Sequence, residues 1–416
     1  MKIGIIVIGD ELLIGQVTDT NSGDIARMIA PAGWQIGEVR TVHDDAEAIR
    51  RVIGEMMGLY DVVLSTGGLG PTKDDITKAT LQGIFGGEMY EDAGVLAHVE
   101  EVFRKRGLKM NGLTRGQAMV PDSCIVIPNA LGTAPVMWFE REGKVLVAMP
   151  GVPFETRHAF ANEVLPRLLD RFADRSVLGH RTLVVVDITE SDLAERLSEW
   201  EDGLQPELHL AYLPQAGYIR LRIDCAGVDN ESVDQALDKA VQWLTDNLGS
   251  HILADEDLTP QQLLMRTLQE HGLSFGSAES CTGGNIAHRM TMLPGVSEVF
   301  MGGVVAYSNE VKMQVLGVDK DVLAENGAVS EPVALQMAQG AQRVLGVDCA
   351  VATSGIAGPG GGSEDKPVGM VCMAFATPKG ALTRTFRFPG NRARIIDRAT
   401  TVALIEMVKA VMEFVK

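Results

Sequence analysis

The fold class is decided by the stretch Lys2-Ile3-Gly4-Ile5-Ile6-Val7-Ile8, which runs directly into Gly9-Asp10-Glu11. A continuous apolar run that ends in a Gly-containing turn is typical of a strand buried on both faces. Asp61–Ser65 repeats the pattern, and residues 21–30 and 45–58 between the two runs have helical spacing and polar N-cap residues. Strands that alternate with helices predict a parallel sheet covered by helices on both faces.

Charge divides the chain into three parts. The whole sequence of 416 residues has 37 Lys and Arg against 55 Asp and Glu, a formal net charge of −18. Residues 1–170 carry −7, residues 171–257 carry −11, and residues 258–416 are neutral. Because 416 residues are too many for one ordinary core, we predict three domains with these bounds.

The second and third parts have their own patterns. The middle part is expected to be a small α+β module in β-α-β-β-α-β order, from Arg181–Val186, Glu190–Trp200, Tyr218–Cys225, Val233–Leu248 and His251–Ala254. Lys144–Met149 is expected to be a further buried strand of the first part. The third part is expected to alternate again, with a closing helix over Asn391–Lys416 and with strands at Ser274–Ala278, Gly302–Ala306, Cys349–Ala352, Val368–Ala376 and Thr383–Phe388. The predicted fold class is therefore α/β, with two α/β domains of mostly parallel sheets joined by a small α+β module.

Composition excludes several classes of function. An acidic chain argues against a nucleic-acid-binding surface, because phosphate contacts need clustered Lys and Arg. No stretch approaches the ~18 apolar residues of a membrane span. Five cysteines without a CxxC pair fit a reducing cytoplasm. We therefore expect a cytoplasmic protein that has no nucleic-acid or membrane partner.

Two glycine-containing loops follow strands of the first part, where the ligands of parallel sheets bind. Backbone N–H groups of the loop after residue 65 can approach a phosphate closely, and its candidate ligand-binding residues are Gly67, Gly68, Gly70, Thr72 and Lys73. The carboxylates of Glu11, Asp74 and Asp75 are candidates for holding a divalent cation beside a diphosphate. The alternative is structural: the glycines form a tight turn, and the aspartates cap a helix.

These loops resemble a known family. Gly9-Asp10-Glu11-Leu12-Leu13, Asp19-Thr20-Asn21-Ser22 and the stretch from Gly67 to Thr77 are similar to the molybdopterin-binding domain of MogA and MoeA proteins, and more closely to the N-terminal domain of the competence/damage-inducible CinA family. The resemblance implies ADP-ribose pyrophosphatase activity that depends on Mg²⁺, Mn²⁺ or Co²⁺. It also implies a homodimer formed through this domain and a KH-like fold for the middle module.

A serine turn in the third part is the sharper signal. Ser277-Ala278-Glu279-Ser280-Cys281-Thr282-Gly283-Gly284 leads from a predicted strand into a helix, whose N–H groups are positioned to stabilise an oxyanion. Ser280 has no histidine partner in the sequence pattern, and a desolvated lysine such as Lys312 is the usual substitute, with Tyr307 as a second proton carrier. Cys281 competes for the role of nucleophile, and sequence chemistry does not separate the two.

Two further segments favour an anionic ligand. The loop from Thr353 to Gly362 contains Ser354, Gly355 and Gly358 and is too rich in glycine for a simple chain reversal. Arg392, Arg394 and Arg398 crowd the start of the last helix, where positive charge opposes the helix dipole unless a phosphate neutralises it.

The third part resembles the CinA C-terminal domain, which includes the PncC-type nicotinamide mononucleotide (NMN) deamidases. The resemblance lies in the serine turn, in Ala306-Tyr307-Ser308-Asn309 with Lys312, in Ser354-Gly355-Ile356-Ala357-Gly358-Pro359 and in Lys366-Pro367-Val368-Gly369. It implies hydrolysis of NMN to nicotinate mononucleotide and ammonia without a cofactor. By the resemblance Ser280 is the nucleophile, Tyr307 and Lys312 move the proton, and the substrate-binding residues are Cys281, Thr282, Gly283, Gly284, Ser354, Gly355, Gly358, Arg392 and Arg394.

One position departs from that family. Relatives often carry Arg six residues after the glycine that matches Gly390, where this chain has Ile396, so phosphate binding passes to Arg392 or Arg394. A different class of function stays open beside the two hydrolases. The chain can instead be a regulatory protein that binds a nucleotide or pterin without turnover and is linked to competence.

Overall fold

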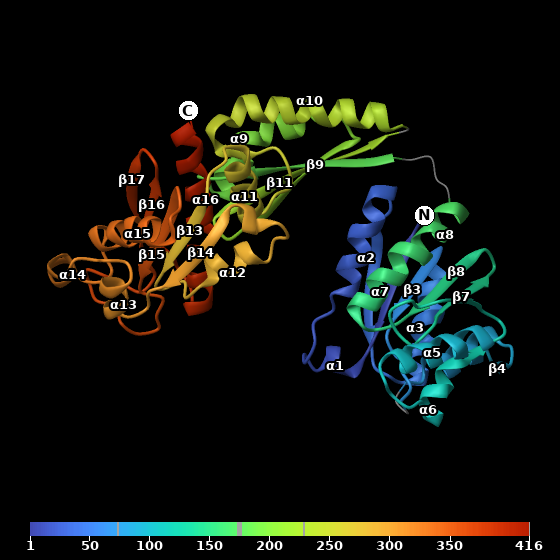
Figure 1. Cartoon of the computed structure of the whole chain (residues 1–416). Coiled ribbons are helices and arrows are strands. Elements are labelled where there is room, and N and C mark those ends of the chain that lie inside the picture. Colours follow the sequence, from blue (N-terminus) through green and yellow to red (C-terminus); the bar gives the residue numbers. More distant parts are fainter. Residues whose placement is uncertain (73–74, 173–176, 228, 416) are drawn as a thin grey trace. The chain divides into compact units, whose positions relative to one another are not determined.

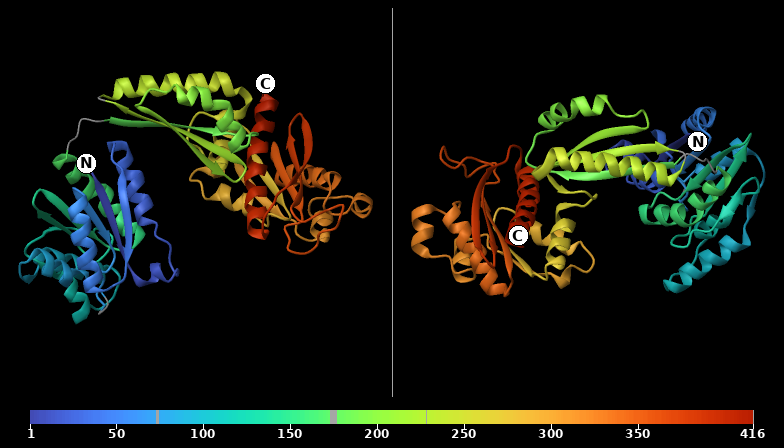
Figure 2. Two further views of the ribbon diagram at one scale, coloured as in Figure 1. Left: turned by 180° about the vertical axis from the view of Figure 1, so that it is seen from behind. Right: turned by 90° about the horizontal axis from the view of Figure 1, so that it is seen from above.

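The computed structural model describes the chain except for residues 73–74, 173–176, 228 and 416. It divides into two compact units, one of residues 1–179 with 224–237 and one of residues 180–223 with 238–416. The elements can be followed in Figure 1, and Figure 2 shows them from behind and from above.

The N-terminal domain is built on a six-stranded sheet of order β2-β1-β3-β8-β7-β6. The first four strands are parallel, and β7 runs antiparallel to both of its neighbours, β8 and β6. Its strands are β1 (Ile3–Ile8), β2 (Ile36–Val42), β3 (Val62–Thr66), β6 (Ile125–Ile127), β7 (Val136–Arg141) and β8 (Lys144–Met149), with the small pair β4 (Met89–Glu91) and β5 (Met119–Pro121) beside it. Its helices are α1 (Asp10–Leu13), α2 (Asn21–Ile29), α3 (Ala46–Leu59), α4 (Thr77–Phe85), α5 (Ala93–Lys105), α6 (Gly112–Arg115), α7 (Pro153–Ala159) and α8 (Leu165–Arg171).

Alternate residues of the central strands build two cores. Ile3, Ile5 and Val7 of β1 pack with α2, α7 and α8, whereas Ile6 and Ile8 pack with α3 and α4 on the other face. Helices therefore cover both faces, as the apolar run at residues 2–8 predicts.

A glycine is required where β3 ends. Gly67 has φ +107°, and a Cβ there would lie 2.0 Å from the carbonyl oxygen of Ile8. The loop after β3 therefore lies against the end of β1, which brings the two predicted glycine-containing loops to one edge of the sheet.

The middle module has the element order β9 (Val177–Val185), α9 (Glu190–Asp202), β10 (Leu208–Gln215), β11 (Tyr218–Gly227), α10 (Asn230–Leu248) and β12 (Ile252–Ala254). Its sheet order is β10-β11-β9-β12. The predicted β-α-β-β-α-β pattern is confirmed. The sequence analysis missed β10, because its exposed residues weaken the alternation.

The C-terminal domain has a five-stranded sheet of order β14-β13-β15-β16-β17, in which the first three strands are parallel. Its strands are β13 (Phe275–Glu279), β14 (Phe300–Val305), β15 (Cys349–Gly355), β16 (Met370–Thr377) and β17 (Gly380–Arg387). Its helices are α11 (Pro260–Glu270), α12 (Asn285–Thr291), α13 (Asn309–Gln314), α14 (Lys320–Asn326), α15 (Glu331–Leu345) and α16 (Arg392–Val415). One face carries α11, α12 and α16, and the other carries α15 on an alanine-rich surface.

The fold class is thus the predicted one: mixed α/β domains with largely parallel sheets and a small KH-like module between them. In the C-terminal domain β13, β14 and β15 end at the same edge of the sheet. Ser280 and Tyr307 follow the first two strands closely, and Ser354 lies near the end of the third. Parallel topology therefore brings these predicted site residues together.

Candidate active sites

The serine turn is fixed to the neighbouring strand. Ser280 is the first residue after β13, and its N–H donates to the carbonyl of Thr353 on β15 at 2.9 Å. The side chain is almost fully buried. The hydroxyl of Ser280 therefore stands at a defined position at the edge of the sheet.

Lys312 meets that hydroxyl. Its Nζ lies 3.0 Å from Ser280 Oγ, 2.8 Å from the carbonyl oxygen of Ala306 and 3.3 Å from that of Tyr307. The side chain of Lys312 is only 2% exposed, and this burial lowers its pKa. When the amine loses a proton, two donors remain for the carbonyls and a lone pair faces Ser280 Oγ. This arrangement lets Lys312 act as the base for the serine.

Cys281 lies in a different environment. Its thiol is buried, and burial raises its pKa to about 12, against an ordinary value near 8.5. The thiolate is the reactive form of cysteine. The structure therefore favours Ser280 over Cys281 as the nucleophile, a choice that the sequence left open.

Glu279 is the residue that sequence reasoning missed. Its buried carboxylate accepts the hydroxyls of Ser277 and Thr282 at 3.1 and 2.8 Å, and the N–H groups of Gly284, Ile286 and Ala287 at 2.9–3.0 Å. The sequence signal for this role was a glutamate directly before the serine, in a turn that leads into a helix.

This capping corrects one prediction. Gly284 N–H is bound to Glu279, and Gly283 N–H donates to the carbonyl of Ser280 at 3.2 Å. The expectation that these two N–H groups at the start of α12 stabilise an oxyanion is therefore wrong, because both already have acceptors. Thr282 also contacts protein, with its Oγ1 2.7 Å from Thr353 Oγ1.

A hydrogen bond joins Tyr307 and Arg392. Arg392 donates to the hydroxyl of Tyr307 at 3.2 Å and to the carbonyl of Gly358 at 3.0 Å. The ring of Tyr307 is exposed, and only its carbonyl contacts Lys312. Arg394 is exposed, and its N–H is capped by Asn391 at 3.0 Å. The structure thus joins Arg392 to the glycine-rich loop and leaves Arg394 at the surface.

Ser354 and Gly355 have structural contacts. Ser354 is buried and donates to the carbonyl of Ala328 at 2.5 Å. A Cβ at Gly355 would lie 2.7 Å from the carbonyl oxygen of Met370, so this glycine allows close packing against β16. Ile396 is partly buried against the apolar core of the domain.

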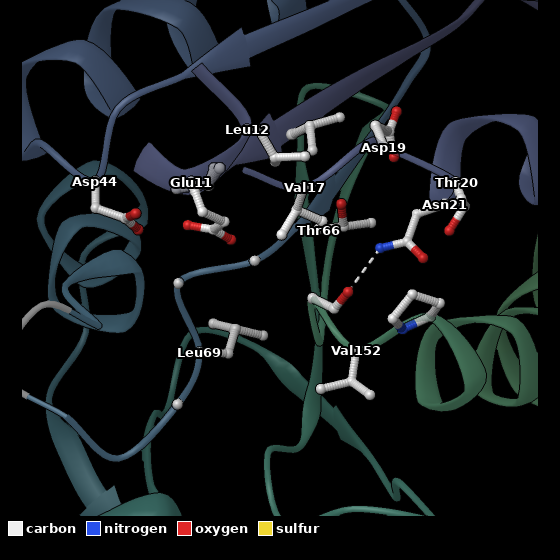
Figure 3. A pocket seen from close by; sticks show the side chains of 18 of the residues that line it. Glu11, Leu12, Val17, Asp19, Thr20, Asn21, Asp44, Thr66, Leu69 and Val152 are labelled. Atoms are coloured by element: carbon white, nitrogen blue, oxygen red, sulfur yellow. Dashed lines mark hydrogen bonds between the residues drawn. The ribbon is translucent and has the colours of Figure 1, made fainter. Parts of the chain in front are cut away.

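The N-terminal domain has a cavity of about 440 Å³ at the carboxyl edge of its sheet, shown in Figure 3. Among the predicted ligand-binding residues, Gly67, Gly68 and Gly70 line it, together with Glu11 and Asp75. Lys73 and Asp74, which were also predicted, lie outside the described residues. The two loops singled out in the sequence therefore share one cavity.

Asp75 supports the loop rather than facing a ligand freely. Its carboxylate accepts the N–H of Gly70 at 2.6 Å, the N–H of Thr72 at 2.9 Å and the hydroxyl of Thr72. Thr72, predicted to bind substrate, thus serves to hold Asp75. Within the part of the chain that the structure describes, no group of three or more His, Cys, Asp or Glu side chains is arranged to hold a metal ion.

Asp44 adds a carboxylate that sequence reasoning treated only as a helix cap. It lines the cavity, and its pKa is raised by burial and by the nearby carboxylates of Asp10, Glu11 and Asp75. Like charges so close together favour either a proton or a cation among them.

Two polar atoms in the cavity wall have no partner within the described structure. They are Oδ1 of Asn21 and Oγ1 of Thr66, and both side chains are buried. Asn21 is held by its Nδ2, which donates to the carbonyl of Gly151 at 2.9 Å (Figure 3). Because leaving a buried polar group unpaired is costly, these atoms point to a polar ligand.

Comparison with known proteins gives the family. A CinA-like protein of Flavobacterium psychrophilum is 39% identical over 418 residues, which cover 99% of each chain. The chain belongs to the CinA family. Its residues 4–170 match the probable molybdopterin binding domain, residues 180–254 the damage-inducible protein CinA KH domain, and residues 258–411 the CinA C-terminal domain.

A second relative matches over nearly the whole chain, and the solved structures named here match over little more than a third of it. A putative competence-damage inducible protein of Desulforudis audaxviator is 38% identical over 95% of each chain. Among solved structures, the competence/damage inducible protein CihA of Agrobacterium tumefaciens is 40% identical and covers 37% of this chain and 98% of its own, with a TM-score of 0.35. A CinA superfamily protein of Klebsiella pneumoniae is 32% identical and covers 38% and 99%, with a TM-score of 0.36. Within the described part of this CinA-family chain, no helix has the length and apolar character to cross a membrane.

Proposed function

We propose that the C-terminal domain hydrolyses the carboxamide of NMN to give nicotinate mononucleotide and ammonia. The observation that carries the proposal is the buried amine of Lys312, 3.0 Å from the hydroxyl of Ser280. A serine next to a desolvated lysine is an activated nucleophile that needs neither histidine nor metal.

The residues support a two-step reaction. Ser280 Oγ attacks the amide carbon while its proton passes to Lys312, and the C–N bond then breaks as Lys312 returns a proton to the leaving ammonia. Water next attacks the ester on Ser280, releasing the nicotinate product and restoring the hydroxyl. We assign the developing oxyanion to the backbone N–H groups of Cys281 and Thr282, because those of Gly283 and Gly284 already have acceptors.

The phosphate of the substrate is assigned to Arg392. This guanidinium is positioned by Tyr307 and Gly358 and lies where the glycine-rich loop meets α16. Arg394 is free to add charge at the surface, whereas Ile396 is apolar and packs against the core. Tyr307 then acts by holding Arg392 and the substrate rather than by direct contact with Ser280.

The test is ammonia release from NMN by the full chain without added metal, compared with Ser280→Ala. Ser297→Ala, a change at an exposed serine elsewhere in the C-terminal domain, is the matched control. Loss of turnover in Ser280→Ala alone supports the proposal. Absence of turnover by the folded unaltered protein overturns it.

For the N-terminal domain we propose that the cavity binds ADP-ribose and cleaves its diphosphate. The unpartnered atoms of Asn21 and Thr66 favour a polar ligand, and glycine backbone at Gly67 and Gly68 suits a phosphate. A divalent cation such as Mg²⁺, Mn²⁺ or Co²⁺ would neutralise the charge of the diphosphate, with Glu11 and Asp44 the carboxylates that line the cavity beside Asp75.

The experiment separates binding from cleavage. Calorimetry measures the binding of ADP-ribose, and product analysis with and without a chelator measures metal-dependent release of AMP and ribose 5-phosphate. Binding without turnover in the presence of all three metals favours the regulatory alternative, in which this domain only binds a nucleotide or pterin.

A further inference from the structure

The second compact unit contains a cleft of about 820 Å³ that neither proposed reaction uses. One wall comes from the KH-like module and includes Glu190, Asp192 and Tyr218. The facing wall comes from β17 and α16 of the C-terminal domain and includes Arg387, Phe388 and Arg398. The cleft is thus large enough for a small ligand.

The two walls are joined by direct contacts. Lys409 of α16 binds Asp187 of the module at 2.7 Å and Glu406 at 2.7 Å. Gly217 of the module lies so close to α16 that a Cβ would be 2.9 Å from Val402. Val184 of β9 belongs to the same apolar core as α16. These contacts therefore hold the two walls of the cleft against each other within this unit.

Four of the charged side chains that line the cleft make no ion pair among the described residues, whereas a fifth, Asp187, is bound by Lys409. Arg289 and Arg384 elsewhere in the domain pair with Asp397 and Glu406. Among the described residues, Arg387 and Arg398 make no ion pair, and neither do Glu190 and Asp192 on the other wall. Each wall thus presents uncompensated charge of one sign to the same space.

We propose that this cleft binds a nucleoside phosphate. The guanidinium groups of Arg387 and Arg398 suit the phosphate, because Arg binds phosphate through paired, charge-assisted hydrogen bonds. Carboxylates such as those of Glu190 and Asp192 are the groups that accept hydrogen bonds from ribose hydroxyls.

The nucleobase of such a ligand would contact aromatic side chains of the cleft. The rings of Tyr218 and Phe388 are partly buried in the cleft, and aromatic faces stack on nucleobases of any sequence. A plain anion would use only the arginine wall and would meet repulsion from the acidic one. A ligand with phosphate, sugar and base uses both.

The test is hydrogen exchange of the full chain with AMP as the probe, and with adenosine and inorganic phosphate as separate arms. AMP is expected to slow exchange in segments 187–192, 214–219 and 387–389. The double variant Arg387→Ala/Arg398→Ala is expected to lose this protection, with affinity for AMP falling ~10-fold or more. Lys320→Ala, which removes an exposed cation elsewhere in the same domain, is the matched control.

A second double variant tests the proposal even if the arginine variant fails to fold. Glu190→Gln/Asp192→Asn is expected to weaken AMP binding while leaving the fold intact, because both side chains lack ion pairs among the described residues. Lack of protection by AMP overturns the proposal, and so does equal protection by phosphate alone. Both outcomes are independent of NMN turnover, since the measurement is repeated in Ser280→Ala.

Discussion

The choice between Ser280 and Cys281 gives the sharpest prediction. Replacing Ser280 by Ala removes the hydroxyl that lies 3.0 Å from Lys312 Nζ. Replacing Cys281 by Ala removes a buried thiol in the next position of the same turn. Both changes delete one atom from neighbouring residues, so a difference in their effects reports on chemistry rather than on disruption of the turn.

The magnitude follows from the pKa of Cys281. With a pKa of about 12, only ~1 thiol in 30,000 is ionised at about pH 7.5. A nucleophile so rarely available supports little turnover. We therefore expect Cys281→Ala to keep kcat within about threefold of the unaltered protein. Ser280→Ala is expected to lower kcat by ~10³-fold or more, as removal of a catalytic serine does in other hydrolases.

The assay is ammonia release from NMN over a range of concentrations, with thermal unfolding of both variants as a control for folding. Alkylation by iodoacetamide adds an independent readout, because the buried thiol of Cys281 should react slowly while the enzyme stays active. The reasoning is refuted if Cys281→Ala abolishes turnover, or if activity disappears in step with alkylation of Cys281 while Ser280→Ala remains active.

Three further changes test other contacts. Lys312→Met should lower kcat by ~10³-fold, as removal of a general base does. In the unaltered protein kcat/KM should rise with pH, with its midpoint below the ordinary pKa of a lysine, because burial lowers the pKa of Lys312 and the neutral amine is the active form. Glu279→Gln should cost ~1–3 kcal/mol of stability, measured by calorimetry against the exposed Glu310→Gln, because an amide NH₂ would then face backbone N–H groups. Thr66→Val should raise the melting temperature while weakening ADP-ribose binding ~10-fold, since its hydroxyl is unpartnered; Thr80→Val, which breaks a 3.0 Å hydrogen bond to Ile76, should lower it.

Much of the fold could be predicted because its central strands are buried on both faces. The apolar runs at residues 2–8 and 61–65 become β1 and β3 almost unchanged. Strands β7 and β10 were harder to predict, since β7 runs antiparallel to its neighbours and β10 carries exposed residues that a single periodicity does not describe. A search for apolar runs finds strands that are buried on both faces. It misses strands that are defined mainly by their pairing with other strands.

The candidate sites were predictable only as far as topology brings loops to one edge. Parallel strands place the residues after β13 and β14 together, which is why Ser280 and Lys312 meet. The direction of each side chain was not predictable: Ser354 turns to Ala328, and Asp75 turns back into its own loop. Hydrogen bonds formed across the fold decide these directions, and the sequence does not contain them as a local pattern.

A comparison of two buried lysines shows why a perturbed pKa alone does not make a catalytic base. Lys78 in the N-terminal domain is also buried, and burial lowers its pKa to about 8. Its Nζ, however, donates to the backbone carbonyl of Gln117 at 2.8 Å and contacts the amide oxygen of the same residue at 3.5 Å. Neither acceptor has a proton to give. Lys312 differs in one contact, the hydroxyl of Ser280 at 3.0 Å. A desolvated amine is therefore a structural donor at residue 78, whereas in the proposed mechanism it is a base at residue 312, and the neighbouring hydroxyl makes the difference.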